Sequence, residues 1–241
     1  MLRLGSLGWC GVRGDGGRGL RSVPMIEHAQ SVAGAYDEIS ELYADHAGSA
    51  FAADPLHRAV VDVFADLVDS TGGGTVLDAG CGPGHISAHL ARRGLAVVGV
   101  DLARAALGLA RGACPSGGFV VGRLEKLPLV SGSVAGVLSS YSIIHTPPER
   151  LPGVLAQMVR VLAGGGHLLV SFQSDEDPAG PVEVFDHQVA TAYRYGIDQV
   201  LEPLREAGMV EVARSVVAGR EDARRGFAQA HLLCRKEQPS T

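Results

Sequence analysis

The chain has 241 residues, of which 46% are hydrophobic and 20% charged, and this composition is typical of a single globular domain. The formal net charge of −5 gives no general attraction to polyanions, so no nucleic-acid partner is expected. The apolar runs stop short of the roughly 18 residues that a membrane-spanning helix needs, so no membrane insertion is expected. The four cysteines lack the spacing of a metal site or a disulfide framework, which favours a cytoplasmic protein without a structural metal.

The first segment, residues 1–30, is expected to be a disordered leader. Residues 1–24 are rich in Gly and Arg and contain no continuous apolar stretch, which argues against a secretory signal. The segment is either a leader translated upstream of a start at Met25 or an Arg-rich targeting or contact segment.

Two helices are expected next, and together they would form an N-terminal helical lid over residues 31–70. The first, predicted at residues 31–45, carries Tyr36, Ile39 and Tyr43 at spacings that stack the three side chains on one face. The second begins after Asp54, which has the properties of an N-cap because a proline and an amphipathic pattern follow it.

Residues 71–236 alternate short apolar runs with helical patterns, which predicts a parallel sheet wrapped by helices. The predicted strands are 75–79, 96–100, 118–121, 134–140, 166–173, 210–218 and 228–235, and the predicted helices are 84–93, 103–112, 148–162 and 198–207. A polar loop without a helix joins the last two strands, so these are expected to be antiparallel. The predicted fold class is therefore α/β, with a Rossmann-like, seven-stranded, mostly parallel sheet, helices on both faces and an antiparallel C-terminal strand.

Two segments of this predicted core carry more specific expectations. Thr146 and Glu149 have the spacing of a capping box, with Pro147 at the first helical position, and are expected to start the helix at 148–162. Residues 174–197 show no clear period and are expected to form a substrate-side insertion, because a loop of this length in a compact domain is more often functional than idle.

The stretch Asp78-Ala79-Gly80-Cys81-Gly82-Pro83-Gly84 lies where the first strand of the core must turn into a helix. Glycine allows positive φ and exposes bare backbone, so a ligand can lie against the main chain and meet N–H groups at the helix start. The dinucleotide fingerprint G-x-G-x-x-G does not fit, because its sixth position is occupied by His85 or Ser87. A nicotinamide oxidoreductase is therefore disfavoured.

A second acidic residue, Asp101, follows the apolar run 95–100. A carboxylate at the tip of the second strand, about 20 residues beyond such a turn, can accept hydrogen bonds from both hydroxyls of a ribose. The glycine turn followed by this acid resembles the cofactor site of the class I S-adenosylmethionine-dependent methyltransferases. The resemblance extends from about Tyr36 to Arg235, and it implies that family's fold, its cofactor S-adenosylmethionine and its methyl-transfer activity.

Residues 122–128 resemble the family's adenine-binding segment, which ends in Leu-Pro. The resemblance implies that Leu124 supplies a backbone N–H and that Glu125 reaches the exocyclic amine, while Leu102 covers one face of the adenine. Many relatives carry Asp where this chain has Arg123. Glu125 is therefore either the partner of the adenine or a solvated loop acid.

Tyrosines are implied near the methionine part of the cofactor. Tyr141 lies in the segment after the fourth strand that borders this part in the family. Tyr36 lies in a stretch similar to the family's YDxxAxxY. The resemblance implies that the hydroxyls of Tyr36 and Tyr43 contact the carboxylate end of the cofactor; the alternative for each tyrosine is an aromatic core face. The predicted cofactor-binding residues are Tyr36, Asp78, Ala79, Gly80, Gly82, Gly84, Asp101, Leu102, Leu124, Glu125 and Tyr141.

The acceptor side is less well defined by the sequence. His145 is the best candidate for a catalytic general base, because neutral imidazole accepts a proton near pH 7; the alternative is a packing or cofactor-contact histidine. Relatives often place substrate contacts where His187, Tyr193 and Arg194 lie, although surface hydrogen bonding is as good an explanation for each. No metal site is expected, and the expected partner is a small-molecule acceptor bound by a monomer or homodimer.

Three functions remain open at this level. The leading hypothesis is a methyltransferase that moves a methyl group from S-adenosylmethionine to an O, N or C nucleophile of a small molecule. A protein or RNA methyltransferase is the first alternative, and the lack of an N/D-P-P-Y tetrapeptide at residues 140–143 disfavours its adenine or glutamine version. The second alternative is a protein that binds the cofactor without transferring methyl, for example a cyclase.

Overall fold

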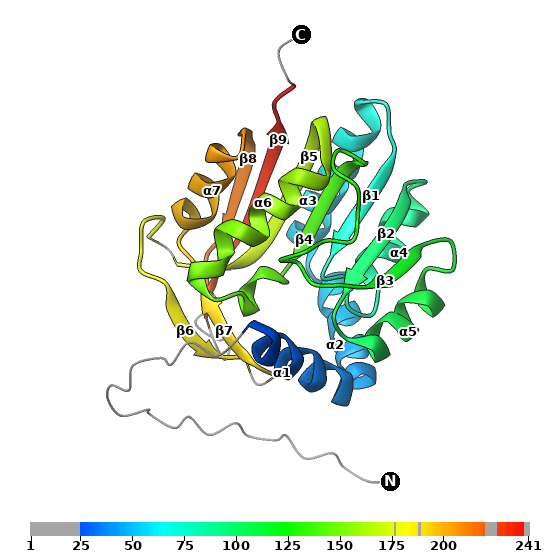
Figure 1. Ribbon diagram of the computed structural model, residues 1–241, viewed down its shortest axis with the longest axis vertical. Coiled ribbons are helices and arrows are strands. Elements are labelled where there is room, and N and C mark those ends of the chain that lie inside the picture. The colour runs from blue at the N-terminus through cyan, green and yellow to red at the C-terminus, as the bar shows by residue number, and fades with distance from the viewer. Residues whose placement is uncertain (1–24, 176, 188, 220–225, 239–241) are drawn as a thin grey trace.

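The computed structural model describes residues 25–238 apart from residues 176, 188 and 220–225 (Figure 1). Its main sheet has seven strands in the order β3-β2-β1-β4-β5-β9-β8. The strands are β1 Thr75–Ala79, β2 Ala96–Asp101, β3 Gly118–Val121, β4 Val134–Ser140, β5 Leu162–Ser174, β8 Met209–Val217 and β9 Ala228–Lys236. The first five in chain order pair in parallel, whereas β9 pairs antiparallel with both β5 and β8. The predicted fold class is confirmed.

Helices cover both faces of the sheet because successive residues of a strand point to opposite sides. Val76 packs in one apolar cluster with residues of α3 and α4, and its neighbour Leu77 packs in another with residues of α6 and α7. The helices are α1 Met25–Glu38, α2 Ser40–Ala53, α3 Pro55–Ser70, α4 His85–Arg92, α5 Arg104–Ala113, α6 Leu151–Val161 and α7 Ile197–Glu206. Helix α5 packs beside α4 and against β3.

The order of the strands positions a ligand site. From β1 the chain first winds outward to β2 and β3 and then returns to place β4 on the other side of β1. In open α/β sheets the crevice at such a reversal, outside the carboxyl ends of the strands, is where ligands bind. Figure 1 shows α1 and α2 lying across this end of the sheet.

The N-terminal helices differ from the prediction in three ways. Residues 25–30 were expected in the leader but are helical, because α1 begins at Met25; residues 1–24 lie outside the described part of the chain. The single helix expected at 31–45 is two helices, broken at Ile39. Helix α3 is not part of a lid, since Val68 and Phe64 pack so closely on β4 that a Cβ at Gly136 would lie 2.7 and 2.9 Å from them.

The capping box expected at Thr146 and Glu149 is wrong. Pro147 is extended, with φ −60° and ψ 146°, because a residue that precedes a proline is driven out of the α region. The segment winds instead into short 3-10 turns at Ile143–His145 and Pro148–Arg150, and α6 begins at Leu151.

The segment 174–197 contains a hairpin that the sequence did not reveal. Strands β6 Glu183–Asp186 and β7 Thr191–Arg194 pair antiparallel in a sheet of their own. Neither strand alternates strictly between polar and apolar residues, so no strand period marks them in the sequence. In Figure 1 the hairpin and α1 lie at the same end of the molecule. No helix in the described part of the chain combines the length and the apolarity needed to cross a bilayer.

Candidate functional site

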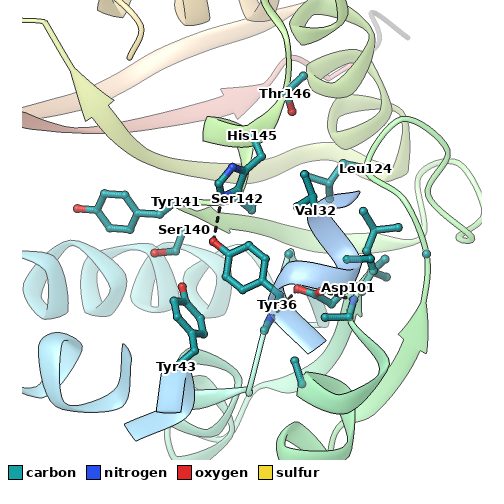
Figure 2. Close-up of a pocket in the computed structure, with 18 of the residues that line it drawn as sticks. Val32, Tyr36, Tyr43, Asp101, Leu124, Ser140, Tyr141, Ser142, His145 and Thr146 are labelled. Atoms are coloured by element: carbon teal, nitrogen blue, oxygen red, sulfur yellow. Dashed lines mark hydrogen bonds between the residues drawn. The ribbon is translucent and has the colours of Figure 1, made fainter. Parts of the chain in front are cut away.

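A cavity of about 940 Å³, which includes its part open to solvent, lies at the carboxyl ends of β1, β2 and β4 beneath α1 and α2 (Figure 2). Nine predicted site residues line it: Tyr36, Gly80, Gly82, Asp101, Leu102, Leu124, Glu125, Tyr141 and His145. These nine are fewer than half of the 20 residues that line the cavity.

The three glycines of the turn do different work, which corrects the expectation that a ligand replaces all their side chains. All three have positive φ. A Cβ on Gly80 would lie 2.2 Å from Cβ of Ser142, and one on Gly84 would lie 2.8 Å from Cα of Ala110, so these two positions are filled by protein. A Cβ on Gly82 would have no neighbour closer than 3.8 Å. Gly82 is thus the glycine that leaves bare backbone beside the cavity.

Asp101 is held in place by main-chain groups at the tip of β2. The N–H of Gly82 donates to Oδ2 at 2.8 Å, and the N–H of Ala103 donates to Oδ1 at 2.8 Å. A carboxylate has about four acceptor positions, so lone pairs on both oxygens remain for a ligand. Burial raises the pKa of Asp101, although these N–H groups oppose the effect. A ligand with hydroxyls or positive charge would stabilise the ionised carboxylate.

Asp78, Ala79 and Gly84 do not line the cavity, contrary to prediction. Asp78 is buried beneath the turn, where its Oδ2 accepts a hydrogen bond of 2.6 Å from the Ser87 hydroxyl at the start of α4. Burial raises the pKa of Asp78 to about 6. Its role is to fasten the glycine turn to α4 from below.

We expect Asp78→Asn to stabilise the protein at neutral pH. The pKa of Asp78 is above its ordinary 3.8, so between about pH 4 and 6 the folded state binds a proton that the unfolded state has lost, and the free energy of unfolding falls as pH rises. Asn still accepts from Ser87 but does not ionise. A shift of about two units corresponds to about 2–3 kcal/mol, which the variant should regain at pH 7.5 and not at pH 4.

Urea unfolding of both proteins at pH 4 and 7.5 measures this difference. Asp69→Asn, at an exposed position of α3, is the control and should change the free energy of unfolding by less than about 0.5 kcal/mol. A variant at Asp78 that is no more stable than wild type at pH 7.5 would refute the buried-carboxylate account.

The walls beside Asp101 are apolar. Leu102, Ala103 and Ala106 come from the start of α5, and Leu124 faces them from the loop after β3, as Figure 2 shows for Leu124. Flat apolar walls of this kind can enclose a planar base. Tyr141, after β4, has φ +53°, a conformation that costs a non-glycine residue roughly 1–3 kcal/mol and is typical of functional sites.

Helices α1 and α2 supply the roof. Tyr36 and Tyr43 lie on opposite sides of the break at Ile39, and their rings meet edge to face with centroids 5.1 Å apart. The carboxylate of Asp37 accepts a hydrogen bond of 2.8 Å from the N–H of Ala105, which caps α5 and pins the roof to it. Tyr36 lies on the cavity wall, and its expected contact with the carboxylate end of the cofactor stays a prediction.

His145 is held by partners from two distant segments. Its Nε2 lies 2.9 Å from the Tyr36 hydroxyl, the contact drawn in Figure 2, and its Nδ1 lies 2.8 Å from the carbonyl oxygen of Thr191 in β7. The His187 ring packs edge to face on it at 5.2 Å. His145 thus joins the roof, the 3-10 turn after β4 and the hairpin.

The structure does not bring Tyr193 and Arg194 to the cavity. Tyr193 is 7% exposed and packs in the core near Tyr195. Arg194 forms ion pairs with Asp175 and Glu183 and lies over the ring of Phe227. Both side chains organise the hairpin, and their expected substrate contacts stay a prediction. His187 does not line the cavity wall either, but its ring packs on that of His145, which does.

Sequence reasoning missed a polar cluster behind the cavity wall. The Ser140 hydroxyl, on the wall, lies 3.2 Å from Nε2 of His57, whose ring stacks at 5.2 Å on that of His231. Burial lowers the pKa of His57 to about 4, so it is neutral at pH 7. These residues are 83 and more positions apart, and no pattern in the sequence joins them.

The cavity is acidic. The described residues that line it include the acidic Asp101 and Glu125 and neither Lys nor Arg. No cluster of His, Cys, Asp or Glu within the described part of the chain could hold a metal ion.

Residues 76–166 match the family described as "Methyltransferase domain". An uncharacterized methyltransferase of Mycobacterium sp. (strain JLS) is 37% identical over 134 residues, which are 55% of this chain and 52% of the relative. A malonyl-acyl-carrier-protein O-methyltransferase of Serratia marcescens is 32% identical over 133 residues, 55% of this chain and 51% of the relative. The chain thus matches about half the length of these relatives.

Solved structures share the fold over most of the chain. A 1,6-didemethyltoxoflavin-N1-methyltransferase of Burkholderia thailandensis, solved with its substrate and S-adenosylhomocysteine, has a TM-score of 0.70 at 20% identity and covers 91% of this chain and 93% of its own. The 4+2 cyclase SpnF has a TM-score of 0.72 at 18% identity, with 88% and 97% covered. Residues 76–166 thus match a methyltransferase domain, and the sheet order, with the glycine turn and Asp101 in one cavity, resembles that of the class I S-adenosylmethionine-dependent methyltransferases.

Proposed function

We propose that this protein transfers a methyl group from S-adenosylmethionine to an O, N or C nucleophile of a small molecule. The main observation behind the proposal is that Asp101 and Gly82 lie together in one cavity. The oriented carboxylate of Asp101 has lone pairs available to a ligand, and it lies beside the exposed backbone of Gly82. This pair suits a ribose diol on the carboxylate and the rest of a nucleoside against the main chain.

The charge of the cavity supports a cationic cofactor. Asp101 and Glu125 face the cavity without a Lys or Arg among the described residues of its wall. A sulfonium ion would be attracted to this wall. The pyrophosphate of a dinucleotide would meet two carboxylates and no counter-charge, which adds to the failure of the dinucleotide fingerprint.

The residues of this chain would act mainly by holding and enclosing the reactants. Asp101 would bind the ribose, and Leu102 and Leu124 would cover the adenine, with Glu125 as its polar partner. When bound, S-adenosylmethionine supplies the activated methyl group. Positioning a nucleophile in line with such a group can contribute about 7–11 kcal/mol. The roof of α1 and α2 would keep water from the site.

A small-molecule acceptor fits the enclosed shape of the site, because α1, α2 and the turn after β4 close around it. His145 is proposed as the base that receives the acceptor's proton, since it lies at the cavity wall and both its ring nitrogens are oriented by hydrogen bonds. A monomer or homodimer in the cytoplasm remains the prediction from the sequence.

Two measurements test the proposal. Titration calorimetry should detect binding of S-adenosylmethionine to the protein and no binding of NADH. Binding of NADH alone would refute the cofactor assignment. Incubation with S-adenosylmethionine and a small-molecule extract of the cells that make the protein should yield S-adenosylhomocysteine. Binding without that product would identify instead a protein that uses the cofactor without methyl transfer.

A further inference from the structure

Two successive hydrogen bonds link β7 to the cavity through His145 and Tyr36. The donor and the acceptor of the first bond are fixed. The carbonyl oxygen of Thr191 can only accept, so Nδ1 of His145, 2.8 Å away, must carry a hydrogen. In the neutral imidazole Nε2 then has a lone pair and no hydrogen. The tautomer of His145 is thus set by the backbone of the hairpin.

The next link is the hydroxyl of Tyr36. It lies 2.9 Å from Nε2, which in this tautomer can only accept, so the tyrosine must donate. Burial raises the pKa of Tyr36, as does the neighbouring Tyr43, so the phenol keeps its proton. The hydrogen of Tyr36 is therefore committed to His145.

The oxygen of Tyr36 consequently offers the cavity a lone pair only. A ligand atom that hydrogen-bonds to it must bring its own hydrogen. A carboxylate has none, and its negative charge would meet no Lys or Arg among the described residues of the cavity wall. A hydroxyl, a phenol, an enol or an N–H group would complete the chain of donors.

Resting on the proposed function, we infer that the methyl acceptor presents an uncharged O–H or N–H group to the oxygen of Tyr36, and is not a carboxylate. Tyr36 and His145 together then remove the proton of the acceptor's O–H or N–H group. The acceptor's proton moves to the oxygen of Tyr36 as the tyrosine's own proton moves to Nε2 of His145. The acceptor's electron pair forms the bond to the methyl carbon while the carbon–sulfur pair returns to sulfur, so one positive charge leaves the sulfonium and appears on the imidazolium. Thr191 stabilises that imidazolium through Nδ1–H until its proton passes to solvent.

The kind of bond formed provides the first test. The protein is incubated with S-adenosylmethionine tritiated in its methyl group and the small-molecule extract, and the labelled products are treated with mild alkali. Methyl esters release volatile methanol, whereas methyl ethers and N-methyl groups survive. We expect the label to stay non-volatile. Release as methanol would overturn this inference and leave methyl transfer intact, and the absence of any labelled product would refute the proposed function itself.

Variants provide the second test on the labelled product. Tyr36→Phe keeps the ring and removes the hydroxyl, so turnover at saturating S-adenosylmethionine should fall by about 10²–10⁴-fold. His145→Gln should behave alike, and the double variant should be no slower than the slower single one, because the two residues act as a unit. The control Tyr193→Phe, in the core, should turn over like wild type. Turnover of Tyr36→Phe within about threefold of wild type would contradict the relay.

A third measurement needs no acceptor. Long-range ¹H–¹⁵N spectra report which nitrogen of a histidine carries the hydrogen, and the signal of His145 is identified by its loss in His145→Gln. The Nδ1–H form is expected in the free protein at pH 8. The Nε2–H form would overturn the inference at its first step.

Discussion

Replacing Asp101 with alanine is expected to weaken the binding of S-adenosylmethionine by at least about tenfold, with little effect on the fold. A hydrogen bond to a charged group contributes about 1.5–3 kcal/mol, and about 1.4 kcal/mol corresponds to tenfold in affinity, so the loss of even one ribose contact reaches that threshold. Calorimetry with S-adenosylmethionine and with S-adenosylhomocysteine measures the change.

Two further proteins make the Asp101 result specific. Asp101→Asn keeps an acceptor oxygen for the N–H groups of Gly82 and Ala103 and should lose less affinity than the alanine variant. Asp66→Ala removes an exposed carboxylate of α3 that pairs with Arg93 and should bind like wild type. Unchanged affinity in Asp101→Ala, with a normal melting curve, would show that the ribose assignment is wrong.

The second large effect is on stability. Gly84→Ala should lower the free energy of unfolding by about 2–5 kcal/mol, because overpacking costs about 1–3 kcal/mol and a left-handed conformation adds about 1–2 kcal/mol for a residue with a side chain. The new Cβ would lie 2.8 Å from Cα and Cβ of Ala110, at φ +81°. Since Ala110 lies in α5, the clash would push that helix away from α4.

Gly82→Ala is the matched control, since it places the same side chain at another positive-φ glycine of the same turn. Its nearest neighbour would be 3.8 Å away, so only the conformational cost of about 1–2 kcal/mol is expected. Affinity for S-adenosylmethionine should fall, because the methyl group occupies the cofactor's side of the turn. Urea unfolding separates the two variants, and equal losses of stability would contradict the division of labour among the glycines.

The sheet and the cofactor side of the site could be predicted because their signals are local. The first strand, the glycine turn and the helix after it are contiguous, and Asp101 ends the next strand at a fixed spacing from them. The carboxyl ends of parallel strands meet at one edge, so the residues after β1, β2 and β4 had to face one crevice. Asp101 and Tyr141 could be placed there without knowledge of side-chain packing, whereas Leu124, after β3, was placed by the family resemblance.

The acceptor side could not be predicted, because its contacts are between distant segments. Tyr36 and His145 are 109 positions apart, and Thr191 acts through its backbone carbonyl, which leaves no mark in the sequence. The roles of Gly80 and Gly84 likewise depend on Ser142 and Ala110, which approach only in the folded chain. A glycine motif indicates where a side chain would not fit, but it does not indicate which atoms occupy that space in the folded protein.

The most direct test of the account is a crystal structure with S-adenosylhomocysteine. We predict that the nucleoside lies in the cavity under α1 and α2, with both ribose hydroxyls within hydrogen-bond distance of the Asp101 carboxylate. The amino-acid part of the ligand should lie along Gly82. A nucleoside bound elsewhere, or an empty cavity in crystals grown at millimolar ligand, would contradict it.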